Sequence, residues 1–172
     1  MRLLILIIFS FSLLFSLTLK SPDITNPLNK NLVYNKFGCS GLNISPQLIW
    51  TNPPKDTKSF AVTIFDPDAP IEGGWWHWIV INIPKDVNKI KRGASKKDMP
   101  KGSIELENSY GEVGFGGACP PKYDKAHHYI FTIYALDVDK LPIKDNSTIE
   151  DVISLIKSHT IAKSSIVSTY KR

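Results

Sequence analysis

The chain has 172 residues, of which 42% are hydrophobic, 10% aromatic and 22% charged, with 12 prolines, 10 glycines and 2 cysteines. This length suits one domain with a buried core, and the composition argues against a disordered chain, collagen, a coiled coil or a disulfide-dense miniprotein. The net charge of +5 comes from scattered basic residues, so it indicates a solvated surface, and no nucleic-acid-binding motif accompanies it.

The first 16 residues have the pattern of an export signal. An apolar run from Leu3 to Leu19 follows the single basic residue Arg2, as in a secretory signal peptide. The residues around position 16 form no clear cleavage site, so an uncleaved N-terminal anchor is the alternative. The sequence therefore predicts an exported protein, periplasmic or secreted, or else a membrane-anchored one. Membrane contact is expected only if residues 1–16 are retained, and residues 17–172 are expected to form one domain.

Short apolar segments predict a mainly β domain. A stretch rich in Asn, Pro, Ser and Lys at 20–58 is expected to be loop with brief strands. Strands are then predicted at 59–65, 78–83, 129–136 and 161–170. The first two of these are apolar on both faces, as in strands buried between two layers. The Lys-rich stretch 85–103 and the Gly-rich stretch 111–117 are expected to be irregular.

One helix is predicted near the C-terminus. Ser147 and Glu150 have the spacing of a capping box, and apolar residues then recur with helical period at positions 149, 152, 153 and 156. The helix should run from about Thr148 to Ser158. The expected fold is an antiparallel β-sandwich with this one C-terminal helix and short peripheral helical turns.

The two cysteines, Cys39 and Cys119, allow two interpretations. They form a disulfide, which an oxidising compartment would allow, or they are two unpaired buried thiols, and the sequence leaves both open. Their spacing is not that of a C-x-x-C motif, so neither zinc nor thioredoxin-like chemistry is indicated. The histidines also lack metal-ligand spacing, and no metal is predicted.

Two groups of polar residues near the predicted strands are candidates for a site. Asp66 and Asp68 follow a buried strand in the run Asp-Pro-Asp-Ala-Pro, which is also a common composition for a turn. His77 lies in Gly-Gly-Trp-Trp-His-Trp, where three indoles suit the wall of a ligand pocket as well as a core. A buried histidine that belongs only to the core is the alternative for His77.

A third candidate precedes the 129–136 strand. Glycines at 111–117 lead to Cys119-Pro120-Pro121, and His127-His128-Tyr129 follows. Such glycines let backbone amides approach an anion, although an ordinary glycine-rich loop is the alternative. Taken together, carboxylates, imidazoles, amides and a tyrosine hydroxyl suit a small phosphate-bearing head group. No serine or cysteine lies in a nucleophile elbow, so we expect a protein that is not an enzyme and needs no cofactor.

Three runs carry a family resemblance. AVTIFDPDAP, WWHWIVINIP and GEVGFGGACPPKYDKAHHYIFTIYALD resemble the phosphatidylethanolamine-binding protein family, in its bacterial and archaeal branch related to Raf kinase inhibitor protein. The similarity extends to LTLKSP, NISPQLIW and STYKR and so covers nearly all of the chain after the signal-like segment. Departures from the family pattern are Ala118, Tyr123 and His128.

The resemblance implies a β-sandwich with a small anion pocket near one end of the sheet. The residues it places at that pocket are Asp66, Asp68, Trp76, His77, Gly117, Cys119, Pro120, Pro121, His127 and Tyr129. Asp66 would orient His77 or contact an amine, while His127 and the rim amides would hold the anion. If both histidines bind phosphate in their charged form, affinity should rise as the pH falls from about 7.5 toward 6.

The expected function is binding of a phosphate-containing small ligand or a phospholipid head group. The alternative is an interaction protein that inhibits a protease or a kinase, as some relatives are reported to do. A weak hydrolase with His77 or His127 as general base is less favoured, because no nucleophile is visible.

Overall fold

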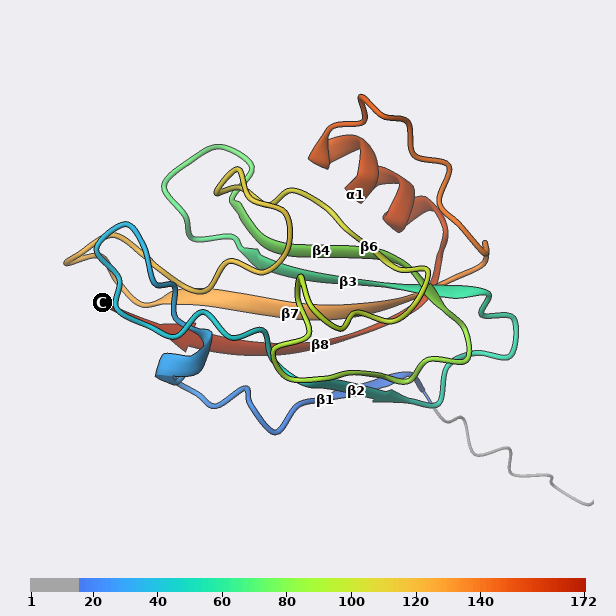
Figure 1. Cartoon of the computed structure of the whole chain (residues 1–172), viewed down its shortest axis with the longest axis horizontal. Coiled ribbons are helices and arrows are strands. Elements are labelled where there is room, and N and C mark those ends of the chain that lie inside the picture. Colours follow the sequence, from blue (N-terminus) through green and yellow to red (C-terminus); the bar gives the residue numbers. More distant parts are fainter. Residues whose placement is uncertain (1–15) are drawn as a thin grey trace, which may run out of the picture.

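The computed structural model describes residues 16–172. Within this range it contains eight strands, one α-helix and one short 3-10 helix (Figure 1). In chain order these are β1 (Thr18–Lys20), η1 (Lys30–Leu32), β2 (Leu48–Thr51), β3 (Ser59–Asp66), β4 (Trp75–Pro84), β5 (Lys89–Ile90), β6 (Ile104–Glu105), β7 (His127–Leu136), α1 (Ile149–Ser158) and β8 (Thr160–Tyr170).

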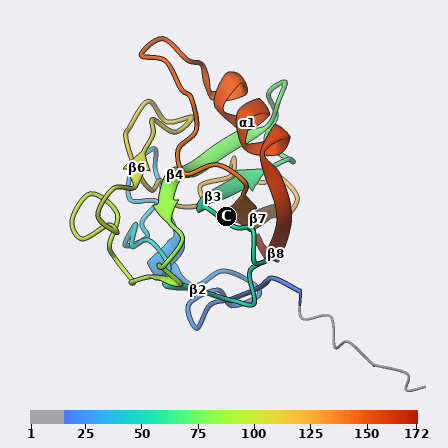
Figure 2. The same ribbon diagram turned by 90° about the vertical axis from the view of Figure 1, so that its right-hand side faces the viewer.

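The strands form two antiparallel sheets, as predicted. A five-stranded sheet has the order β6-β4-β3-β7-β8, and a three-stranded sheet has the order β1-β2-β5. Figure 2 shows α1 on one side of the large sheet and β2 on the other side. The large sheet is therefore the middle of three layers, which explains why its central strands are apolar on both faces.

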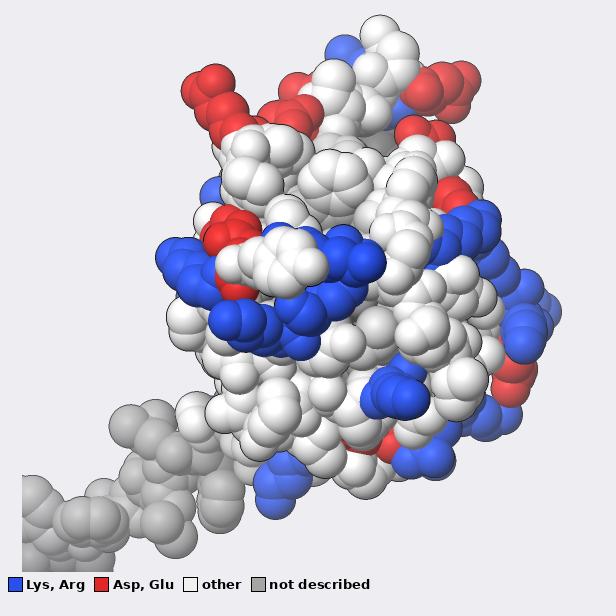
Figure 3. Space-filling view, turned by 90° about the vertical axis from the view of Figure 1, so that its left-hand side faces the viewer, with Lys and Arg blue, Asp and Glu red and all other residues white. Residues whose placement is uncertain are grey.

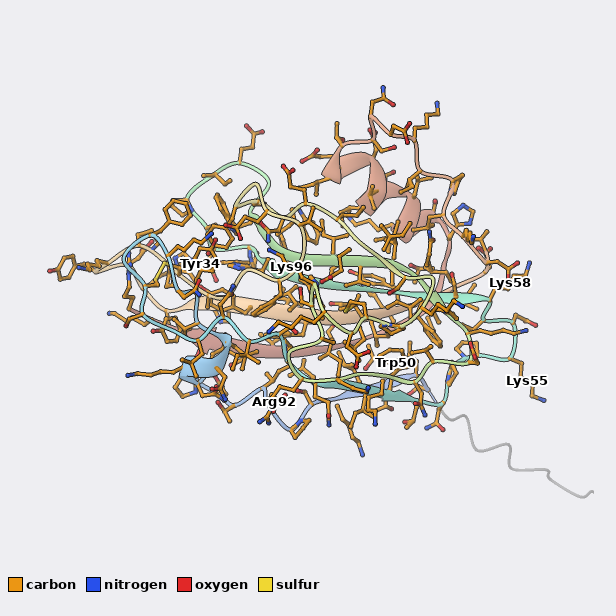
Figure 4. All side chains as sticks on the ribbon, viewed as in Figure 1. Tyr34, Trp50, Lys55, Lys58, Arg92 and Lys96 are labelled. Carbon is orange, nitrogen blue, oxygen red and sulfur yellow. A yellow bond between two sulfur atoms is a disulfide. The ribbon has the colours of Figure 1, made fainter. Side chains whose placement is uncertain are left out.

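Side chains of β3 illustrate this two-sided burial. Phe60, Val62 and Ile64 belong to the core between the two sheets, whereas Ala61 belongs to the core under α1. Trp50 of β2 belongs to the core between the sheets (Figure 4). Its ring centroid lies 5.3 Å from that of Phe60. The alternation places Asp66, the last residue of β3, in phase with the inter-sheet core.

Strand β4 is longer than predicted, because it begins at Trp75 rather than Trp78. Gly74 ends the preceding turn with a φ of +72°, and a side chain there would collide with the ring of Phe65. The chain thus enters the sheet immediately after the glycines. The prediction that residues 85–103 are irregular was wrong at Lys89–Ile90, which forms the short strand β5 beside β2.

The signal-like segment lies almost entirely outside the described residues, since only Ser16 falls within them. The following sequence forms β1, whose Leu19 pairs with Trp50 of β2. In residues 16–172 no helix is long and apolar enough to span a membrane.

The predicted helix is present, but its capping box is shifted by one residue. Thr148, not Ser147, is the N-cap, and its hydroxyl accepts a hydrogen bond from the amide of Asp151. The Asp151 carboxylate in turn accepts from the Thr148 amide, at 3.0 Å. This register directs Val152, Ile153 and Ile156 toward the sheet.

The shifted cap gives a stability prediction. We expect Thr148→Ala to lower the free energy of unfolding by about 1 kcal/mol, because the Asp151 amide loses its acceptor. Urea denaturation measures the change. Ser154→Ala, at an exposed position on the same helix, is the control and should not lower the free energy of unfolding, because alanine favours the helix interior. Equal stabilities for wild type and Thr148→Ala would contradict this assignment of the cap.

Candidate functional site

The topology brings three strand ends together. Strands β4 and β7 both run antiparallel to β3, so their first residues meet the last residue of β3. Asp66 pairs in register with Trp75, and Phe65 pairs with Ile130. Polar residues from three distant parts of the sequence therefore share one end of the large sheet.

A cavity of about 490 Å³ lies at this end. Seven of the predicted site residues line it, namely Asp66, His77, Cys119, Pro120, Pro121, His127 and Tyr129. Figure 3 looks onto this end of the molecule and shows basic side chains grouped beside acidic ones around largely uncharged surface. The described lining includes no Lys or Arg, so its charged groups are Asp66 and His127.

Asp66 and His127 form a buried pair, exposed by only 3% and 1%. Nδ1 of His127 lies 2.8 Å from Oδ2 of Asp66, and Oδ1 of Asp66 accepts a hydrogen bond from the Asp68 amide at 2.9 Å. The other ring nitrogen of His127 lies 3.2 Å from Oδ2 of Asp124. Both nitrogens of His127 therefore face carboxylates.

This arrangement corrects the expected role of His127. Burial lowers the pKa of His127, but its hydrogen bonds to Asp66 and Asp124 outweigh burial and raise that pKa above the ordinary value. In the protonated form that this shift favours, the ring donates one N–H group to each of the two carboxylates. His127 thus neutralises Asp66 and leaves no free N–H for an anion.

His77 is buried beside this pair but differs from His127 in its hydrogen-bond partners and in the direction of its pKa shift. Its Nδ1 lies 2.8 Å from the carbonyl oxygen of Gly116, and Asp66 makes no hydrogen bond to it within the described part of the chain. Burial lowers the pKa of His77 to about 4. The expectations that Asp66 orients His77, and that His77 becomes charged between pH 7.5 and 6, were therefore wrong.

Three buried polar atoms of the lining have no hydrogen-bond partner among residues 16–172. They are Nε1 of Trp75, Nε2 of His77 and the hydroxyl of Tyr129. A buried polar atom without a partner costs free energy, so such atoms are usually satisfied by the protein, by water or by a ligand. Their concentration in one cavity marks it as a candidate binding site.

Asp68 does not line the cavity, contrary to prediction. Its carboxylate accepts hydrogen bonds from the amide and from Nδ1 of His128, at 2.9 and 2.7 Å, and lies 3.0 Å from Nζ of Lys125. The bonds from His128, with the ion pair to Lys125, hold the pKa of Asp68 far below its usual range. Asp68 therefore fastens the turn after β3 to the start of β7.

Trp76 is also outside the cavity, and Trp75 takes the place predicted for it. Trp76 packs on the helix side of the sheet, with its ring centroid 4.2 Å from that of Phe65. Trp76 pairs with Phe65 and Trp78 pairs with Ile64, so His77 is the extra residue of a β-bulge. Trp75 and His77, two residues apart, both face the cavity.

Gly117 supports the rim without lining the cavity, and the predicted nest of free amides is absent from the described glycine-rich loop. The Gly116 amide donates to the carbonyl of His77 and the Gly117 amide to Oδ1 of Asn43. A side chain at Gly117 would lie 2.5 Å from the carbonyl oxygen of Leu32. Gly117 is needed for this close approach of two backbones.

Cys39 and Cys119 are joined by a disulfide at the edge of the cavity. Nη1 of Arg172 lies 3.2 Å from the sulfur of Cys39, so the C-terminus rests on this bridge. The bridge attaches the loop that carries Phe37 to the Pro120-Pro121 rim. Phe37 lines the cavity although it is 70% exposed.

Sequence reasoning missed several lining residues besides Trp75. These are Phe37, Ala69, Pro70, Ile71, Ser109 and Tyr110. Ala69 and Pro70 belong to the predicted Asp-Pro-Asp-Ala-Pro run and Ile71 follows it directly, so that run was an available signal. Phe37, Ser109 and Tyr110 lie in loops whose positions depend on tertiary contacts. Within residues 16–172 no group of three or more His, Cys, Asp or Glu side chains could hold a metal ion.

Sequence comparisons identify relatives that cover most of the described region. Residues 20–171 match the phosphatidylethanolamine-binding protein family. UPF0098 protein YbcL of Escherichia coli K12 is 45% identical over 147 residues, which are 84% of this chain and 80% of that protein. UPF0098 protein YbhB of the same organism is 39% identical over 140 residues, 80% of this chain and 88% of that protein.

Solved structures give the same result. The crystal structure of Escherichia coli YbcL, a member of the same family, has a TM-score of 0.87 at 41% identity and covers 92% of this chain and 99% of its own. A phosphatidylethanolamine-binding protein homologue from Chlamydia trachomatis has a TM-score of 0.76 at 31% identity, with coverages of 91% and 98%. The chain belongs to the phosphatidylethanolamine-binding protein family, which confirms the resemblance of its three motifs. In general terms it is a ligand-binding protein.

The two buried histidines should titrate in opposite directions from the ordinary value of about 6.5. In ¹⁵N NMR spectra we expect His127 to remain an imidazolium at pH 6.5 and to lose its proton only at higher pH. His77 should stay neutral, with its proton on Nδ1, until the pH approaches about 4. Titration of His77 near pH 6.5 would contradict the burial and hydrogen bonding described for it.

Proposed function

We propose that this protein binds a small phosphate-bearing molecule, or the head group of a phospholipid, in the cavity at the end of the large sheet. The observation that carries the proposal is the set of three buried, unpartnered polar atoms on Trp75, His77 and Tyr129. The Trp75 indole and the Tyr129 hydroxyl are donors that suit phosphate oxygens.

The size of the cavity supports a head group rather than a whole lipid. A volume of about 490 Å³ is within the usual range for small-molecule sites, of roughly 300–1,000 Å³. Apolar side chains surround the polar atoms, including Phe37, Ile71 and Pro120. A phosphate with a short amine substituent fits this combination, and acyl chains would remain outside.

Binding without turnover is favoured by the state of the groups that resemble nucleophiles. Cys119 is in a disulfide and is no thiolate source. The Ser109 hydroxyl accepts a hydrogen bond from the Trp76 amide, and neither histidine hydrogen-bonds to it within residues 16–172. No activated nucleophile therefore accompanies the buried imidazoles.

We also propose that the protein is exported. The signal-like pattern of residues 1–16 supports this, and so does the disulfide, because such bonds persist in oxidising compartments.

Calorimetry of the full chain with phosphate and phosphoethanolamine tests the proposed binding. We expect saturable binding in the wild type and its loss in the double variant Asp66→Ala/His127→Ala. This variant removes both partners of the buried pair, so it leaves no isolated charge. Trp75→Phe keeps the aromatic wall but removes one donor, and affinity should fall roughly 5-fold.

The control is a second histidine–aspartate pair. Nδ1 of His159 lies 2.8 Å from Oδ1 of Asp137, and both side chains are partly exposed and remote from the lining. Asp137→Ala/His159→Ala should bind like the wild type. Absence of heat with both ligands in the wild type would overturn the proposal, as would wild-type binding by the pocket variants.

A further inference from the structure

We propose that His77 makes the cavity selective for a ligand that donates a hydrogen bond from its anionic group, namely a phosphate that keeps one proton. An anion of the same shape without a proton, such as a sulfate ester, should be rejected. The inference rests on the proposed function and narrows the ligand to a phosphate monoester, because the phosphodiester of a phospholipid head group keeps no proton at neutral pH.

The hydrogen bonding of His77 determines which of its nitrogens carries the proton. A carbonyl oxygen only accepts hydrogen bonds, so Nδ1 of His77 must donate to the carbonyl of Gly116, 2.8 Å away. The Gly116 amide donates to the His77 carbonyl at 2.9 Å, and this second bond fixes the two residues side by side. The neutral ring therefore presents the lone pair of Nε2.

Nε2 of His77 is an acceptor without a donor. The residue is 2% exposed and lines the cavity, and no donor within residues 16–172 reaches Nε2. The rings of Tyr110 and Tyr129 contact the imidazole edge-on. Only the contents of the cavity remain to satisfy this atom.

The charges around His77 keep it an acceptor at physiological pH. Burial lowers the pKa of His77 to about 4, an effect that the hydrogen bond to Gly116 and the negative charge of Asp66 do not overcome. The cation of His127 acts in the same direction as burial. Tyr110 and Tyr129 stay neutral, because burial raises the pKa of both.

The charge of the cavity points to the same ligand. Asp66 is the carboxylate of the described lining, and His127 neutralises it. No Lys or Arg among the lining residues is available to balance a dianion. A monoanion that carries its own proton meets less repulsion from Asp66 and supplies the donor that Nε2 lacks.

A matched pair of ligands tests the selectivity. Phosphoethanolamine and 2-aminoethyl hydrogen sulfate have the same shape, but only the phosphate still carries a proton at pH 6, because its second pKa is about 6. In calorimetry of the full chain at pH 6 we expect the phosphate to bind more tightly by on the order of 10- to 100-fold, because the sulfate leaves Nε2 unsatisfied. The affinity for phosphoethanolamine should fall as the pH rises from 6 to 8, whereas the affinity for the sulfate ester should stay weak and independent of pH.

The histidine itself is tested by substitution and by NMR. In the variant His77→Gln the new side chain offers an N–H₂ donor as well as an acceptor. The affinities for phosphoethanolamine and for the sulfate ester should then lie within about threefold of each other. His159→Gln, at the partly exposed histidine, should keep the full preference. If His77→Gln does not fold, ¹⁵N NMR of the wild-type protein tests the same inference. When phosphoethanolamine binds, the resonance of His77 Nε2 should move upfield while Nδ1 stays protonated.

The outcomes separate this inference from the function on which it rests. Tight binding of both ligands at pH 6, within about threefold of each other, would overturn the selectivity and leave the pocket intact. An unmoved Nε2 resonance in the phosphoethanolamine complex would also overturn it. Binding of neither ligand would overturn both the selectivity and the proposed function.

Discussion

Asp66 and His127 form a buried hydrogen-bonded pair that joins the last residue of β3 to the first residue of β7. Burying two charges costs several kcal/mol per ion unless their hydrogen bonds are complete, and loss of one partner costs roughly 3–5 kcal/mol. Here the bonds are complete, because the Asp68 amide and Asp124 occupy the remaining positions. The turn after β3 and the polar floor of the cavity depend on this pair. Because the two members of this pair satisfy each other, we expect neutral donors, rather than this pair, to bind the proposed anion.

Much of the fold could be predicted from hydrophobic patterns. Four elements agree with prediction to within two residues at each end, namely β3, β7, β8 and α1. Along each of them the hydrophobic residues recur with one constant spacing. The start of β4 could not be predicted, since it depends on a glycine turn and on the bulge at His77. Strands of two residues, such as β5, have too little pattern to detect. They form because a neighbouring strand offers free backbone groups.

The positions of site residues could be predicted where the in–out alternation of a strand extends to them. Asp66 continues the alternation of β3, and His127 that of β7, so the strand period is enough to place both side chains near the core. Trp75 was missed because the bulge decides which tryptophan faces the cavity, and Phe37 because the disulfide decides where its loop lies. The chemical roles were harder to predict than the positions. Whether His127 holds an anion depends on Asp124, and whether His77 is charged depends on how deeply it is buried.

We propose that the fold leaves polar atoms of the cavity unpaired so that a ligand can bind them, and the substitution Tyr129→Phe tests this most directly. This change deletes a buried hydroxyl without a partner in residues 16–172 and keeps the ring. We expect the free energy of unfolding to rise by about 1 kcal/mol while affinity for phosphoethanolamine falls about 5-fold. Tyr123→Phe, at a tyrosine that is 93% exposed, should change neither quantity. A Tyr129→Phe protein that is less stable and binds phosphoethanolamine as tightly as the wild type would contradict the account.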